Sequence, residues 1–232
     1  MKKTILTLAA IGALSLTASA QNILVWDFFG DNSSNRPTMD STFNVLGTSI
    51  STLSRGATAP ATVGANSFRT TGFGNDGINL DNTDYFEWTL TVTEPVYNIS
   101  LNSIEARFAG TPSYATNAPG GVTMAYAYSL DGGSSFTLTD TFQVFATPSA
   151  FSFDLTGISA LQNLTSTNEI TFRFFASGQT TTGGWGFSNT EAQAEGLVLT
   201  GTIPEPSTYA LLALAGAGLA GHMIRRRRRA GH

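Results

Sequence analysis

The chain has 232 residues and no cysteine, and its two histidines, His222 and His232, stand close to the C-terminus. Without a thiol, the chain can form no disulfide, no thiol nucleophile and no thiolate metal site. Without a histidine before residue 222, Ser-His-Asp catalysis, histidine-ligated zinc and a histidine general base are excluded from most of the chain. We therefore expect a protein without enzymatic activity, with carboxylate chemistry as the one catalytic route left open.

Positive charge is scarce between residues 21 and 203. This range contains no lysine and fifteen acidic residues, and its five arginines are Arg36, Arg55, Arg69, Arg107 and Arg173. Nucleic acids and anionic lipids are both bound by clustered positive charge, so neither is expected as a partner of this part. An acidic surface with many Ser, Thr, Asn and Gly residues suits an extracellular protein.

The N-terminus has the three parts of a secretory signal peptide. Met1–Lys3 is a short positive segment, Ile5–Leu16 is apolar, and Ala18 and Ala20 form a small-residue cleavage pattern. We predict that residues 1–20 are removed by signal peptidase and that the mature chain starts at Gln21. A transmembrane anchor is the alternative, but the apolar run is shorter than the roughly 20 residues that such a helix needs.

The C-terminus combines three features in a fixed order. Pro204, Glu205 and Pro206 come first, followed by an uncharged, mostly apolar run at 209–224 and five arginines at 225–229. The prolines exclude a helix at the motif, and the apolar run predicts a short transmembrane helix. The cluster Arg225, Arg226, Arg227, Arg228 and Arg229 is expected to stop transfer on the cytoplasmic side. A buried helix with a solvated basic tail is the alternative, and it explains the arginine cluster less well.

This order of features resembles the PEP-CTERM sorting signal of Gram-negative bacteria, over residues 203 to 229. The resemblance implies an exported precursor that the tail holds in the inner membrane. An exosortase-type membrane protease is then expected to process the chain near the Pro-Glu-Pro motif and release it to the cell surface or the exopolysaccharide matrix. The resemblance implies a destination and no activity.

The range 21–203 has the alternation of β-strands. Apolar and polar residues alternate from Tyr85 to Thr93 and again from Val122 to Leu130, and 157–165 could form one or two helical turns. Further strands are expected at 23–29, 43–45, 50–53, 99–108, 151–155, 170–174 and 197–199. We predict one all-β domain, an antiparallel β-sandwich with jelly-roll-like topology, followed by the single C-terminal transmembrane helix.

Three segments of this domain also resemble β-rich PEP-CTERM proteins of environmental bacteria. They are 84–90 (DYFEWTL), 126–133 (YAYSLDGG) and 196–202 (GLVLTGT), the last of which runs directly into the Pro-Glu-Pro motif. This resemblance implies architecture and no chemistry.

The segment 129–136 (SLDGGSSF) fits the Asp-box pattern. This pattern resembles a hairpin turn of sialidases and of many other β-proteins. Asp131 can accept hydrogen bonds from the turn, and the glycines can adopt positive φ. We predict a structural hairpin.

The segment 74–84 (GNDGINLDNTD) concentrates oxygen ligands. Calcium prefers carboxylate and carbonyl oxygens, which makes Asp76, Asp81 and Asp84 candidate ligands. The spacing fits no known calcium loop, so a solvated loop without a cation is the alternative.

Sugar binding and sugar hydrolysis are the two alternatives to a non-catalytic surface or matrix protein. Trp185 lies in a glycine-rich stretch and is the candidate for an exposed, sugar-stacking aromatic, with burial in the core as the alternative. Trp88 alternates with apolar residues and is expected in the core. Glycoside hydrolysis needs two suitably spaced carboxylates. The available acids are Asp27, Glu87, Glu105, Asp131, Asp154 and Glu169, and no motif selects a pair.

Overall fold

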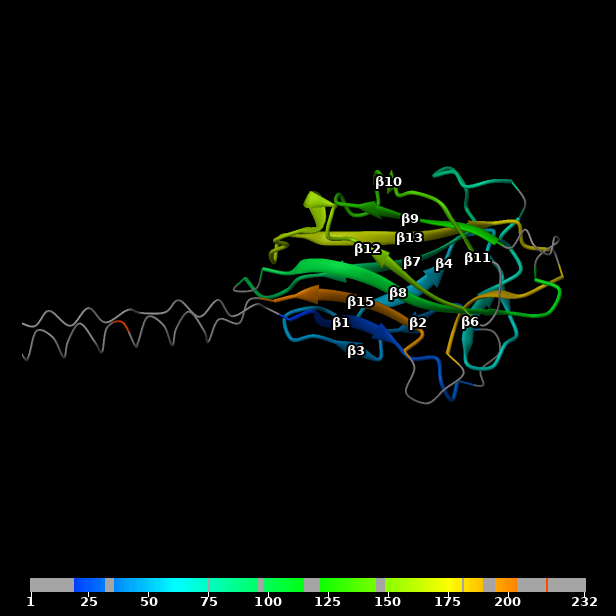
Figure 1. Cartoon of the computed structure of the whole chain (residues 1–232), viewed down its shortest axis with the longest axis horizontal. Coiled ribbons are helices and arrows are strands. Elements are labelled where there is room, and N and C mark those ends of the chain that lie inside the picture. The colour runs from blue at the N-terminus through cyan, green and yellow to red at the C-terminus, as the bar shows by residue number, and fades with distance from the viewer. Residues whose placement is uncertain are drawn as a thin grey trace, which may run out of the picture.

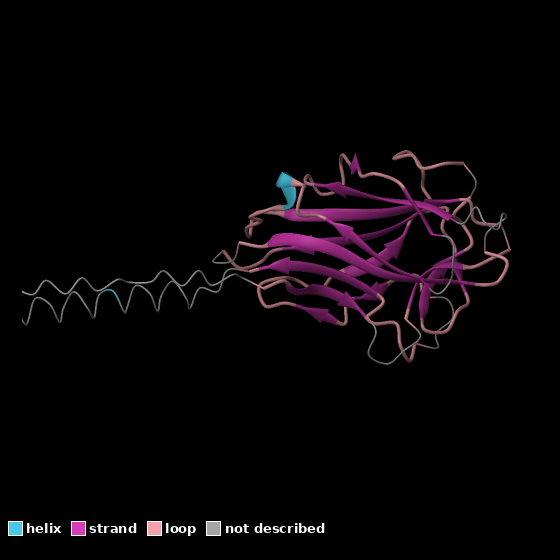
Figure 2. Cartoon of the chain, in the orientation of Figure 1, coloured by secondary structure: helices cyan, strands magenta, loops and turns pink. Residues whose placement is uncertain are grey.

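The computed structural model describes residues 19–31, 36–74, 76–95, 98–114, 122–144, 149–180, 182–189 and 195–203, together with Gly216. The described part is a sandwich of two antiparallel sheets (Figures 1 and 2). The predicted all-β sandwich is thereby confirmed. The predicted transmembrane helix at 209–224 lies outside the described residues, apart from Gly216. Among the described residues, no helix has the length and apolar character needed to cross a membrane.

The first sheet contains both ends of the domain. Its strands, in spatial order, are β3 (Phe43–Asn44), β1 (Gln21–Trp26), β15 (Leu197–Thr202), β8 (Ser100–Gly110), β14 (Trp185–Ser188), β6 (Ser67–Thr70) and β5 (Ala61–Thr62), and β12 (Ser149–Asp154) also pairs with β8. The long strand β8 pairs with β15 along its first half and with β14 at its end. One strand therefore joins two groups of shorter strands.

The second sheet is built around β13. Its order is β10 (Thr137–Leu138), β9 (Val122–Ser129), β13 (Glu169–Ser177), β7 (Tyr85–Thr91), β4 (Thr52–Arg55) and β2 (Met39–Asp40), and β11 (Phe142–Val144) also pairs with β9. A single 3₁₀ turn at Ser159–Leu161 lies within the segment expected to be helical.

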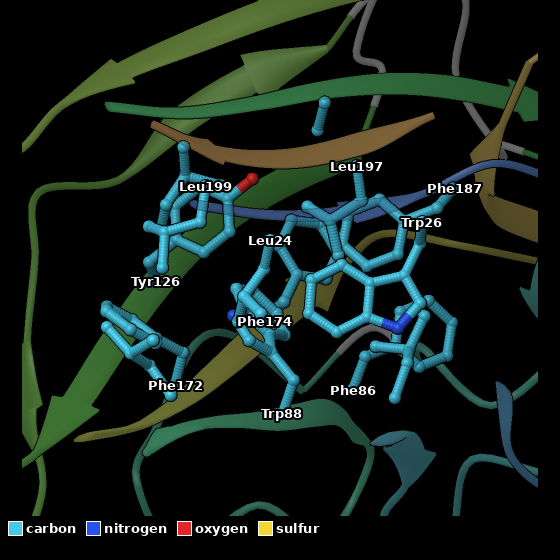
Figure 3. Close-up of a cluster of buried hydrophobic side chains, with 14 of the residues drawn as sticks. Leu24, Trp26, Phe86, Trp88, Tyr126, Phe172, Phe174, Phe187, Leu197 and Leu199 are labelled. Carbon is cyan, nitrogen blue, oxygen red and sulfur yellow. The ribbon is translucent and has the colours of Figure 1, made fainter. Parts of the chain in front are cut away.

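Alternating side chains fill the space between the sheets. In β7 the residues Phe86, Trp88 and Leu90 are buried, while the residues between them are partly exposed, as the sequence pattern predicts. Aromatic side chains from both sheets meet in the core (Figure 3). Trp26 of the first sheet contacts Trp88 of the second edge to face, with ring centroids 6.1 Å apart.

The first and last strands of the domain are neighbours. Gln21, the first residue of β1, pairs with Gly201, and β15 ends one residue later at Thr202. Both chain ends of the domain therefore lie at the same end of the sandwich (Figure 1), which we call the terminal pole. The opposite end, the distal pole, carries the described loop residues 71–74, 76–84, 178–180 and 182–184.

Candidate functional site

Trp185 is buried, as its alternative interpretation has it, so its candidate role as an exposed sugar-stacking aromatic is wrong. Its side chain is 0% exposed and stacks on Phe108 with ring centroids 4.9 Å apart and an angle of 8° between the planes. The neighbouring glycines allow close packing rather than an open loop. A Cβ atom on Gly183 would lie 2.3 Å from the Cα of Tyr114, and one on Gly186 would lie 2.3 Å from the carbonyl oxygen of Phe68. Trp88 is buried, as predicted.

The Asp-box segment forms the predicted hairpin between β9 and β10. Asp131 accepts hydrogen bonds from the backbone amides of Ser134 and Ser135 at 3.0 and 2.9 Å, and from the hydroxyls of Ser129 and Ser135 at 2.6 Å each. Gly132 and Gly133 adopt positive φ values of 69° and 86°. The serine hydroxyls and turn amides hold the pKa of Asp131 well below its usual range. This carboxylate is therefore fully engaged in shaping the turn.

The candidate carboxylates are spread over different parts of the fold, and most have structural partners. Glu87 forms an ion pair with Arg173 at 2.7 Å, and that guanidinium lies between the rings of Tyr85 and Phe136. Asp27 accepts hydrogen bonds from the amide of Phe29 and the side chain of Asn189, and Asp154 accepts two from Thr156. Glu169 begins β13 and is exposed. Glu105 lines a surface depression.

Glu105 belongs to a continuous row across the outer face of the first sheet. Neighbouring strands place Ser152, Glu105, Val198, Val25 and Phe43 opposite one another in register. Directly opposed residues of antiparallel strands point to the same face. The residues that alternate with this row, including Trp26, Ala106 and Leu197, belong to the core cluster. The row therefore lies on the side of the sheet that faces away from the core.

A depression of about 440 Å³ opens on this face. It is lined by Glu105, Ala106, Arg107, Ala150, Phe151, Ser152, Glu195 and Val198. Glu195 accepts a hydrogen bond of 2.8 Å from the Asn22 side chain, and Glu105 accepts one of 3.2 Å from the Ser103 hydroxyl. We call this depression, with the row that ends at Phe43, the outer-face site. It presents two carboxylates and one guanidinium beside apolar side chains such as Phe151 and Val198.

Sequence reasoning missed Glu195 and Phe43 as members of this site. Glu195 is separated by 173 positions from its partner Asn22. Phe43 is 47% exposed at the edge strand β3, about 14 Å from β8 at about 4.8 Å per strand step. Only the strand order brings these residues onto one face, and no local pattern in the sequence reveals it.

The three predicted calcium ligands are not brought together. Asp76 and Asp81 are exposed, whereas Asp84 is buried with 4% of its surface accessible. Among the described residues, no group of three acidic or other metal-ligating side chains is close enough to hold a metal ion. The described structure therefore does not form the predicted calcium site of three aspartates. Burial and the charge of Asp76 nevertheless both raise the pKa of Asp84.

The remaining predicted residues belong to the export and sorting signals. Gln21 begins β1, and Ala20 directly before it is exposed. Ala18, the motif Pro204–Pro206 and the arginines 225–229 lie outside the described residues.

Fold and sequence together define an antiparallel β-sandwich with a sorting segment at its C-terminus. Residues 202–229 match a family model described as the PEP-CTERM protein-sorting motif, as the sequence predicts. Proteins with this motif are exported and sorted to the cell surface, and the motif implies processing by an exosortase.

The other comparisons concern the body. A mutant of Xylanase10C from Cellvibrio japonicus, solved in complex with xylopentaose, is similar over 73% of this chain and 28% of its own, with a TM-score of 0.39 and 8% identity. The chain thus spans less than a third of that protein. No curated protein sequence matches the chain.

Proposed function

We propose that the protein is an exported, non-catalytic β-sandwich of the bacterial cell surface or exopolysaccharide matrix. The observation that carries this proposal is the pairing of Gln21 with Gly201. The folded body begins where the export signal is expected to end, and its last strand finishes where the matched sorting motif begins. The two signals therefore flank a complete sandwich, so both can be removed without cutting a strand.

The precursor is held in the inner membrane of a Gram-negative cell by the helix at 209–224 and the arginines at 225–229. An exosortase-type protease cuts near Pro204–Pro206, beyond the buried side chain of Ile203. We also propose that the strand order of the sandwich is jelly-roll-like.

Replacing all five arginines at 225–229 with serine tests membrane retention. Because the cluster stops transfer, the variant should leave the inner-membrane fraction more readily than the parent protein, when the two are compared in a host without exosortase activity. Arg36→Ser, which removes one arginine of the β-sandwich, is the control. It should leave membrane retention unchanged. Identical fractionation of the cluster variant and the parent would contradict the anchoring role.

A second candidate function is carbohydrate binding at the outer-face site. Sugar rings stack on aromatic faces, while their hydroxyl groups bind to carboxylate, guanidinium and serine side chains. The outer-face site offers Phe43 at one end of its row and Glu105, Arg107 and Glu195 at the other. The two ends lie about 14 Å apart, and the residues between them, Val198 and Val25, are buried, so the ends are the surfaces that a sugar chain would contact.

Glycan-array binding of the full chain in detergent tests this candidate. Phe43→Ala and Glu105→Gln should each reduce the signal several-fold, whereas Phe29→Ala should leave it unchanged. Phe29 is a matched control because it is 45% exposed and lies outside the row. No signal for the parent protein, or equal loss in all three variants, would argue against sugar binding.

The same polysaccharides serve to test hydrolysis by Glu105 and Glu195. If the parent protein releases new reducing ends and Glu105→Gln does not, the protein is a glycoside hydrolase and the non-catalytic proposal is contradicted. A complete lack of release from a broad panel would favour the non-catalytic protein.

A further inference from the structure

Asp84 is a buried carboxylate whose hydrogen bonding is incomplete. Its side chain is 4% exposed, and its Oδ2 atom has no hydrogen-bond partner among the described residues. A buried charged oxygen without a partner is costly unless a proton, a cation or a donor satisfies it. No arginine forms an ion pair with Asp84 in the described part of the chain.

The charged side chain that shifts the pKa of Asp84 is another carboxylate, Asp76. Burial raises the pKa of Asp84 above its ordinary value, and the negative charge of Asp76 raises it further, while the backbone amides of Asp84 and Gly74 lower it. Two carboxylates thus share one loop, and neither forms an ion pair with an arginine in the described part of the chain. Such a pair favours either a bound cation or protonation.

The loop that carries both aspartates is fixed to the end of β13. The Ser177 hydroxyl donates to the Gly74 carbonyl at 3.1 Å and accepts from the Gly77 amide at 2.9 Å. The Gly178 amide also donates to the Gly74 carbonyl at 2.7 Å, and Asn82 donates to the Gly77 carbonyl at 2.9 Å. The relative positions of Asp76 and Asp84 are therefore set by the fold before any ligand arrives.

We propose that Asp84 and Asp76 bind a calcium ion at the distal pole, with backbone carbonyls of residues 76–84 and water completing its oxygen ligands. Two carboxylates and several neutral oxygens are the donor set that this hard cation prefers. Asp81 takes no part. It is exposed, and its amide bonds to the Asn79 side chain as part of a local turn. The site lies at the end of the sandwich opposite the sorting motif, so it faces away from the membrane in the precursor.

Thermal unfolding of the full chain in detergent, with excess EGTA or with 10 mM CaCl₂, tests this proposal. Sites of extracellular modules bind calcium with a Kd of about 10⁻⁴ to 10⁻³ M, so calcium should raise the Tm by about 5 °C. The increase should vanish in Asp84→Asn and shrink in Asp76→Asn. It should persist in Asp81→Asn, the matched control from the same loop.

Asp76→Asn keeps the test decisive if Asp84→Asn fails to fold, because Asp76 is exposed and outside the core. An unchanged Tm for the parent protein on adding calcium would overturn the proposal. In that case a proton would satisfy Asp84. The Tm of the parent protein in EGTA would then rise relative to that of Asp84→Asn as the pH falls from 7 to 5. Loss of the calcium effect in Asp81→Asn as well would also overturn it, because the ion would then bind elsewhere.

Discussion

At the residue scale, the Asp131 side chain organises a turn by accepting four hydrogen bonds although it is exposed to solvent. Its hydroxyl and amide partners stabilise the charged form, so its pKa is lower in the folded chain than in the unfolded chain. A group of this kind stabilises the fold above its unfolded pKa of about 3.9, and this contribution is lost as the pH falls through the folded value.

Asp131→Ala should therefore lower the Tm at pH 7, and the difference from the parent protein should narrow as the pH falls below about 4. Asp140→Ala removes an exposed acid from the same region and serves as the control, for which no change is expected. Thermal unfolding followed by circular dichroism between pH 2 and pH 7 measures both. A difference that stays constant down to pH 2 would contradict this account of the turn.

Trp185 shows how a glycine-rich sequence can mislead. Glycines often mark exposed loops, but Gly183 and Gly186 here permit backbone and rings to approach Trp185 closely. Nothing local distinguishes the two uses of glycine, because the contacting residues Tyr114 and Phe68 are distant in sequence. The Asp-box, by contrast, was predictable because all of its hydrogen bonds lie within a few residues.

Trp185→Ala should lower the free energy of unfolding by about 3–5 kcal/mol, because it leaves a cavity beside Phe108. Phe43→Ala, at an exposed edge position, should cost about 0.5 kcal/mol or less. Urea unfolding of both variants measures these values. If Phe43→Ala lowered the free energy of unfolding as much as Trp185→Ala, the assignment of Trp185 to the core and of Phe43 to the surface would be contradicted.

At the scale of elements, β15 is the strand on which the first sheet depends. Leu197 and Leu199 are buried between Ala106 and Ile104 of β8 on one side and Trp26 and Leu24 of β1 on the other. The sorting motif follows this strand immediately. Processing of the tail must therefore occur beyond Ile203 if the folded body is to survive.

A chain that ends at Ile203 should unfold at the same temperature as the full chain in detergent. A chain that ends at Gly196 lacks β15 and should show no cooperative unfolding, because β1 and β8 lose their common partner. Circular dichroism during heating distinguishes the two. A cooperative transition in the shorter chain would mean that β15 is dispensable, contrary to its central place in the sheet.

Long strands were easier to predict than their order. The alternation in β7 and β9 indicates both the strand and its buried face, since that signal is local. One edge of β8 pairs first with β15 and then with β14, and these partner residues are about ninety positions away in the sequence. The outer-face site follows from that pairing, so the sequence alone indicates Glu105 as one acid among many and leaves Glu195 and Phe43 unnoticed.

At the scale of the whole molecule, the two poles differ in what they carry. The terminal pole holds both chain ends, and Asp131 and Asp154 lie at strand ends on this side. Acidic side chains repel anionic lipid headgroups, so the body has little affinity of its own for the membrane. We therefore propose that attachment depends on the tail and ends when the tail is cut.

The distal pole carries the loop of Asp76 and Asp84. We propose that this pole points away from the membrane in the precursor, because β15 ends at the opposite pole, where the matched sorting motif begins. Any ligand at the distal loops is therefore accessible before and after processing. The outer-face site lies between the two poles.

The most direct test of this account is the intact mass of the native protein, measured together with its location in fractionated cells of its own host. We predict a chain that starts at Gln21, ends close to Pro204–Pro206 and is found in the surface or matrix fraction. A chain that keeps Arg225–Arg229 and remains in the membrane fraction would contradict the account. It would instead describe a permanently anchored protein.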